Sequence, residues 1–143
     1  MTVRQLRVVV HAEDYDRAVA FYRDVLGLGE EAAYAGGDGA HVTILDAGRA
    51  TLEIANTAQV GLIDDVEVGR PVSPHIRIAF EVDDVVADTN ALAGSGAVVL
   101  APPTETPWRS LNSRLSAPAG LQLTLFEELD EPDDSDAGDG VLG

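Results

Sequence analysis

The fold is decided first by the stretch DYDRAVAFYRDVLGL, which spans residues 14–28. Its apolar side chains recur every three or four positions, a spacing that predicts a helix with one buried face. These positions are Tyr15, Val19, Tyr22, Val25 and Leu26. Asp14 is a favourable N-cap, and Gly27 can adopt the left-handed backbone conformation that ends a helix. We therefore expect a helix from about residue 15 to residue 26.

Strand-like segments lie on both sides of this helix. The run RQLRVVVH at residues 4–11 alternates and is rich in β-branched residues, which predicts a strand before the helix. Three more strand-like runs follow, at about residues 30–34, 41–46 and 51–56, and glycine-containing turn sequences separate them. The first half of the chain therefore reads βαβββ.

The second half of the chain repeats this order. The alternating run HIRIAFEV at residues 75–82 predicts a strand, Asp83 and Asp84 can cap a helix, and Gly94 or Gly96 can end it. Three strand-like runs complete the unit: AVVL (97–100), WRSLNSRLS (108–116) and LQLTLFE (121–127), with a Pro-rich link at 101–107 after the first.

Equivalent landmarks of the two halves are separated by a nearly constant number of residues. They are Arg7 and Arg77, Asp14 and Asp83, and Gly27 and Gly96, which are 70, 69 and 69 residues apart. A constant offset together with a repeated element order indicates a duplicated module. We expect an α+β protein with two βαβββ modules, about residues 1–56 and 74–127, joined by a linker at 57–73. Together they form a single domain, residues 1–129.

Composition excludes several classes of function. The 143 residues include 25 acidic and 9 basic side chains, a net charge of -16, so a nucleic acid or an anionic membrane would repel the chain. Cysteine is absent, which excludes disulfides, thiolate nucleophiles and cysteine metal sites. No apolar run approaches the roughly 18 to 20 residues that span a bilayer, and the N-terminus lacks the pattern of a signal peptide. We expect a cytoplasmic protein.

Half of the net charge lies at the C-terminus. The segment EELDEPDDSDAGDGVLG, residues 127–143, carries 8 acidic residues and no basic one. Such a segment cannot bury enough apolar surface to offset the entropy of ordering it. We therefore expect residues 130–143 to form a disordered acidic tail.

Three motifs carry a resemblance to a known family. They are DxxxAxxFYxxVLGL at 14–28, IAFEVDD at 78–84 and TPWRSLNSRLSAPAGLQLTLFE at 106–127. Over about residues 4–127 the chain resembles the vicinal oxygen chelate superfamily of glyoxalases, bleomycin-resistance proteins and extradiol dioxygenases. The resemblance implies that the strands of both modules form a half-open mixed β-barrel around a cavity, with the helices outside. It also implies that a second subunit often completes this cavity, so we expect a homodimer.

The resemblance further implies a divalent metal ion in the active members, held by four side chains that project into the barrel. In this sequence the four positions fall on Arg7, Glu53, Arg77 and Thr124. An arginine side chain is permanently charged and has no lone pair for a metal ion, so two of these positions repel a cation. We therefore expect no metal and no other cofactor.

A register slip would give an alternative metal site. His11 and His75 lie on the same strand faces as Arg7 and Arg77, because a shift of an even number of residues preserves the alternation of side chains. Together with Glu53 these histidines could hold one divalent metal ion.

The strand face opposite the helices is unusually polar. Alternation directs eight candidate ligand-binding side chains toward the cavity: Arg7, His11, Glu53, His75, Arg77, Asn112, Arg114 and Thr124. The resemblance implies that a ninth, Trp108, lies at the mouth of the cavity. One interpretation is that Arg7, Glu53 and Arg77 form an ion-paired network in place of the metal. The other is that positive charge remains for an anionic or carbonyl-bearing ligand.

Three functions are consistent with these residues. The leading hypothesis is a protein that binds a small, planar, polar molecule, similar to the antibiotic-sequestering bleomycin-resistance proteins. The alternative is a lyase, isomerase or dioxygenase that uses a divalent cation at His11, Glu53 and His75, with Glu81 or Glu105 as base. The third is an interaction subunit whose cavity is filled.

Overall fold

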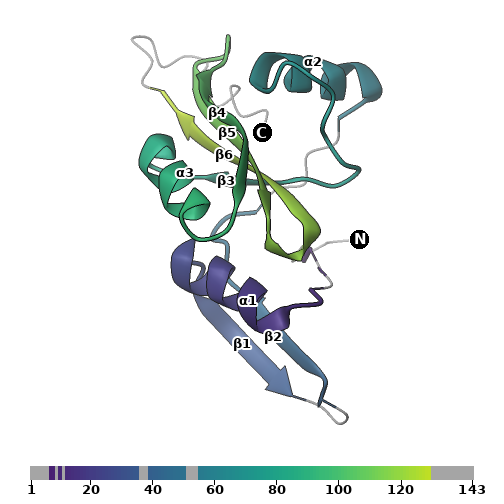
Figure 1. Ribbon diagram of the computed structural model, residues 1–143, viewed down its shortest axis with the longest axis vertical. Helices are drawn as coiled ribbons and strands as arrows, with labels where there is room; N and C mark the ends of the chain where they lie inside the picture. The colour runs from purple at the N-terminus through teal and green to yellow at the C-terminus, as the bar shows by residue number, and fades with distance from the viewer. Residues whose placement is uncertain (1–6, 9, 11, 36–38, 51–54, 130–143) are drawn as a thin grey trace. The chain divides into compact units, whose positions relative to one another are not determined.

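The computed structural model describes residues 7–8, 10, 12–35, 39–50 and 55–129. The protein is of the mixed α+β class, as the sequence predicts, and its described strands form two separate sheets rather than a closed barrel. The chain divides into two compact units, with the boundary between Ile54 and Ala55 (Figure 1). None of the helices in the described ranges is long and apolar enough to cross a membrane.

The first unit contains the predicted helix and a hairpin. The helix begins as α1 (Tyr15–Val19) and continues as a π-helical segment, η1 (Ala20–Val25). The strands β1 (Glu30–Ala35) and β2 (His41–Leu45) pair in antiparallel fashion. The strands predicted at 4–11 and 51–56 fall largely on residues outside the described ranges.

The ends of the predicted helix are confirmed, but its internal hydrogen bonding differs from a regular α-helix. The side chain of Asp14 caps the start, because it accepts a hydrogen bond from the backbone N–H of Arg17 at 3.2 Å. Near the end, the N–H of Leu26 donates to the carbonyl of Phe21 at 2.9 Å, five residues earlier, which is the π-type pattern. Gly27 then adopts a φ of 89°, the left-handed conformation that ends the segment.

The second unit has the predicted βαβββ order. Its elements are β3 (Ile78–Glu81), α3 (Val85–Ala93), β4 (Val98–Glu105), β5 (Ser110–Ala117) and β6 (Leu121–Glu128). The sheet order is β3-β6-β5-β4, in which β3 runs parallel to β6 and the other neighbours are antiparallel. Asp84 caps α3 through a hydrogen bond from the N–H of Ala87 at 3.0 Å.

One face of this sheet forms the apolar core with α3. The buried side chains that lie between them include Val85, Leu92, Leu115, Leu123 and Leu125. The hydroxyl groups of Thr89 on α3 and Ser113 on β5 are 2.7 Å apart within this layer. Because side chains alternate along a strand, the residues between these positions on β5 and β6 point to the opposite face of the sheet.

Three boundaries differ from the sequence-based expectation. The Pro-rich segment at 101–107 was expected to be a link, but β4 continues through it to Glu105 with two shifts of register. This is possible because β4 is an edge strand, where prolines need not donate to a neighbouring strand. Trp108 lies in the turn before β5 rather than at the start of a strand, and His75 lies in a bend before β3.

The linker also contains an element that the sequence analysis did not anticipate. Residues Thr57–Glu67 form helix α2. Its N-cap is Asn56, whose side chain accepts a hydrogen bond from the N–H of Gln59 at 2.9 Å. Figure 1 shows α2 and α3 on opposite sides of the four-stranded sheet. The second unit therefore consists of three layers, with the sheet in the middle.

Two glycines form a matched pair that tests whether the left-handed backbone conformation at Gly27 requires glycine. A Cβ at Gly27 or at Gly61, which lies within α2, would meet no atom within 4 Å, but only Gly27 has a left-handed φ. We expect Gly27→Ala to destabilise the protein by about 1–2 kcal/mol, because a Cβ is strained in this conformation. Gly61→Ala is expected to stabilise α2 by up to about 1 kcal/mol. Urea unfolding measures both; equal effects of the two substitutions would contradict the argument.

Candidate functional site

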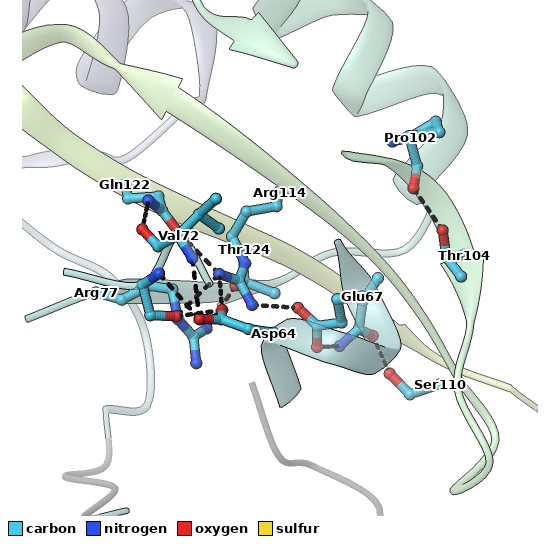
Figure 2. Close-up of polar contacts among 12 residues, drawn as sticks. Asp64, Glu67, Val72, Arg77, Pro102, Thr104, Ser110, Arg114, Gln122 and Thr124 are labelled. Atoms are coloured by element: carbon cyan, nitrogen blue, oxygen red, sulfur yellow. Dashed lines mark hydrogen bonds and ion pairs between the residues drawn. The ribbon is translucent and has the colours of Figure 1, made fainter. Parts of the chain in front are cut away.

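The candidate site is built on the face of the second sheet that points away from α3. Three of the predicted cavity residues lie there, namely Asn112 and Arg114 on β5 and Thr124 on β6, and Gln122 of β6 lies beside them. Arg114 and Thr124 are directly opposite each other in the β5–β6 register. Figure 2 shows Arg114, Gln122 and Thr124 near Asp64 and Glu67 of α2, the helix of the linker. The sequence therefore predicted the polarity of this face but not the element that covers it.

Arg114 is the centre of the polar cluster. Arg114 is fully buried, with a relative exposure of 0%. Its Nη1 lies 3.0 Å from Oδ1 of Asp64, and its Nη2 lies 2.8 Å from Oε1 of Glu67. Nη1 also donates to the side-chain oxygen of Gln122 at 2.8 Å. The guanidinium group thus connects β5 to both carboxylates that α2 directs toward the sheet.

Glu67 is held at both of its oxygens. In addition to the ion pair with Arg114, its Oε2 accepts a hydrogen bond from Nδ2 of Asn112 at 2.7 Å. The side-chain oxygen of Asn112 in turn accepts a hydrogen bond from the hydroxyl of Ser110. A buried carboxylate is stable only when it is paired and its lone pairs are satisfied, and this one meets both conditions.

Asp64 holds the segment that leads from α2 toward β3. Its carboxylate accepts hydrogen bonds from the hydroxyl of Ser73 at 2.6 Å and from the backbone N–H groups of Val72 and Ser73, each at 3.1 Å. Burial alone would raise the pKa of Asp64, but the hydrogen bonds from Ser73, Arg114 and Val72 outweigh it and lower the pKa below its usual value. The carboxylate is therefore charged at neutral pH.

Arg77 and Thr124 lie next to each other at one end of this cluster. Nη1 of Arg77 donates a hydrogen bond to Oγ1 of Thr124. Thr124 is fully buried, whereas Arg77 is half-buried just before β3. The resemblance assigns metal ligands to these two positions, but a guanidinium has no lone pair for a cation, and an uncharged hydroxyl is not one of the usual zinc ligands. In the described parts of the chain, no group of three or more His, Asp and Glu side chains is arranged to hold a metal ion.

The other predicted site residues belong to other segments of the chain. Arg7 lies in the first unit with an exposed side chain, and its Nη2 is 4.0 Å from Oε1 of Glu31. His75 is exposed. Trp108 is half-buried, and its indole Nε1 is buried without a hydrogen-bond partner among the described residues. The predicted His11 and Glu53 lie outside the described ranges.

Two further residues belong to the site, and the sequence analysis missed both. These are Asp64 and Glu67, which lie three positions apart and therefore on one face of α2. The signal that could have found this helix is Asn56, a favourable N-cap eight residues before Asp64. Nothing in the local sequence pairs these carboxylates with Arg114, because that contact joins residues about fifty positions apart.

Most of the sequence matches one family model. Residues 4–125 match the Glyoxalase/Bleomycin resistance protein/Dioxygenase superfamily. The chain belongs to this superfamily. The resemblance carried by the three sequence motifs is thereby confirmed. No curated protein matches the chain in sequence.

Several solved structures are similar to the chain. A glyoxalase-related enzyme from Fulvimarina pelagi is 16% identical, covers 88% of this chain and 89% of its own, and has a TM-score of 0.54. A protein of unknown function from Agrobacterium tumefaciens is 19% identical, with 90% and 97% coverage and a TM-score of 0.56. A family enzyme from Burkholderia phytofirmans is 16% identical, with 81% and 91% coverage and a TM-score of 0.50. At these identities the likeness concerns the fold alone.

The lowered pKa of Asp64 predicts an acid-sensitive contribution to stability. The contribution is fully present above the unfolded-state pKa of about 3.9 and is lost as the pH falls through the lower folded-state pKa. We expect Asp64→Asn to be less stable than the wild type at neutral pH, with a difference that shrinks as the solution is acidified below about pH 4. Urea unfolding across this pH range measures the difference.

The neighbouring carboxylate provides a matched control. Asp65 lies in the same helix but is exposed. The stability difference between Asp65→Asn and the wild type should stay nearly constant over the same pH range. A difference for Asp64→Asn that does not change with pH would contradict the assignment of the charge to Asp64.

Proposed function

We propose that the protein binds a small, planar, anionic or carbonyl-bearing molecule at the polar face of its second module, without a divalent metal ion. The observation that carries this proposal is the hydrogen bond between Arg77 and Thr124. Family members that use a metal place two of its ligands at these positions, and here a guanidinium takes the place of a metal-binding side chain. A positively charged side chain thus stands at a position where metal-using members have a ligand to the cation.

The chemistry of arginine supports an oxygen-bearing ligand. A guanidinium presents its N–H groups in a rigid planar fork that matches a carboxylate or a similar pair of oxygens. The hydroxyl of Thr124, which is fully buried, supports one Nη of Arg77 and so limits the orientations of the fork. Half-burial of Arg77 also reduces competition from water, which strengthens a charge-assisted hydrogen bond.

The role that fits such binding is sequestration rather than catalysis. The superfamily includes bleomycin-resistance proteins, and a metal-free site agrees with a binding role of that kind. Glu81 and Glu105, the candidate bases of the alternative enzyme hypothesis, are both exposed and lie on β3 and at the end of β4. Among the residues that the structure describes, no hydrogen bond or ion pair holds either carboxylate against the polar face as a general base would require.

Metal content separates the binding protein from the enzyme before any ligand is known. Untagged protein purified without chelator is expected to contain far less than one metal ion per chain by mass spectrometry. Added nickel, manganese, zinc or iron should leave the melting temperature unchanged, because an ion that bound the native state would raise it. Near-stoichiometric metal would contradict the proposal and favour a site formed by His11, Glu53 and His75.

A substitution at Arg77 tests the binding site itself. Benzoate and related planar aromatic carboxylates serve as probes, with benzamide as the neutral analogue. We expect Arg77→Ala to weaken benzoate binding by roughly tenfold or more, the effect of losing one charge-assisted hydrogen bond. Calorimetric titration measures the affinity, and thermal unfolding checks that the variant is folded.

The control is Arg70→Ala, which removes an exposed arginine from the segment between α2 and β3. This variant should bind benzoate like the wild type. Equal affinity of Arg77→Ala and Arg70→Ala would place the ligand elsewhere.

A further inference from the structure

Helix α2 is held on the sheet by charge more than by apolar contact. Ile63 is the one apolar residue of this helix that is buried. Val60 and Leu62 are exposed, with relative exposures of 37% and 50%. The helix has 11 residues and contains Gly61 near its middle. A helix of this length and composition is not stable by itself in water, so its position depends on its contacts with the sheet.

The contacts that fix α2 are those of its two buried carboxylates. Asp64 and Glu67 both pair with Arg114, and Glu67 also accepts a hydrogen bond from Asn112. Ionic contacts of this kind depend on both partners, because a buried carboxylate that loses its partner lowers its free energy by returning to water. An arrangement held in this way can therefore open without unfolding the apolar layer beneath α3.

The sheet face under α2 carries two positive charges of its own. Arg114 lies directly opposite Thr124 across the β5–β6 pair, and Arg77 donates to the hydroxyl of the same threonine. Two guanidinium groups thus flank Thr124. The Nε of Arg114 is buried and has no hydrogen-bond partner among the described residues, so the carboxylates of α2 do not satisfy every donor of this face.

We propose that α2 is a lid over a binding site for a ligand with two acidic groups. In the closed state the helix itself fills that site. Asp64 and Glu67 stand where the two acidic groups of that ligand bind, and the ligand displaces α2 when it enters. This inference rests on the proposed function and specifies its substrate class as small dianions. Because a tethered lid acts at an effective concentration of about millimolar, it competes strongly with a small ligand.

Hydrogen exchange tests whether α2 opens as a unit. In the wild type, the amides of α2 are expected to exchange at least about tenfold faster than those of β5 and β6, because their opening does not require global unfolding. The double variant Asp64→Asn, Glu67→Gln should exchange faster still in α2 and unchanged in β5 and β6. Asp65→Asn, which removes an exposed carboxylate of the same helix, should behave like the wild type. If the amides of α2 exchange at the same rate as those of β5 and β6 in the wild type, the proposal that α2 is a lid is wrong.

Binding of a simple dianion tests the ligand class. Succinate is the probe, and acetate at equal ionic strength is the control with one carboxylate. The double variant is expected to bind succinate at least about tenfold more tightly than the wild type, since the competing carboxylates are gone. Acetate should bind weakly to both. Equal affinity of the two proteins for succinate, or equal affinity of the variant for acetate and succinate, would overturn the inference.

The two proposals can fail separately. If benzoate binding depends on Arg77 while α2 exchanges only with β5 and β6, the lid is wrong and the proposed binding site stands. If α2 opens and the double variant binds succinate, but Arg77→Ala leaves benzoate binding unchanged, the proposed site at Arg77 is wrong, and only the opening of α2 over Arg114 stands.

Discussion

The structure of the second unit depends on one buried guanidinium. Arg114 is fully buried on β5, and a charge in that position requires compensation from another part of the chain. Asp64 and Glu67 supply it, and through them α2 becomes the third layer of the unit. Replacing one carboxylate changes a local charge balance, whereas replacing Arg114 removes the reason for α2 to lie on the sheet at all.

The same register that buries Arg114 separates the two roles of the sheet. Ser113 and Leu115 face α3 and contribute to the apolar layer, while Asn112 and Arg114 face α2. A shift of one residue in β5 would place the arginine in the apolar layer, at a large cost in desolvation. Stability of the core and polarity of the opposite face are therefore set by one alternating pattern.

Local rules in the sequence predicted those parts of the fold that local interactions determine. Asp14, Asp84 and Gly27 mark helix ends because caps and left-handed turns involve only neighbouring residues. The continuation of β4 through its prolines could not be predicted, because it depends on β4 being at the edge of the sheet. The pairing of α2 with Arg114 was missed for the same reason, since the contact exists only after distant segments pack together.

Charge is the physical basis of the ligand site proposed at Arg77. A divalent ion and a guanidinium both attract carboxylates and carbonyl oxygens, but the guanidinium does so with directional hydrogen bonds and no open coordination position. The hydrogen bond between Arg77 and Thr124 therefore supports the proposal of a site that holds a ligand, rather than one that activates water. The two carboxylates of α2 already use the neighbouring Arg114 in this way, as ligands supplied by the protein itself.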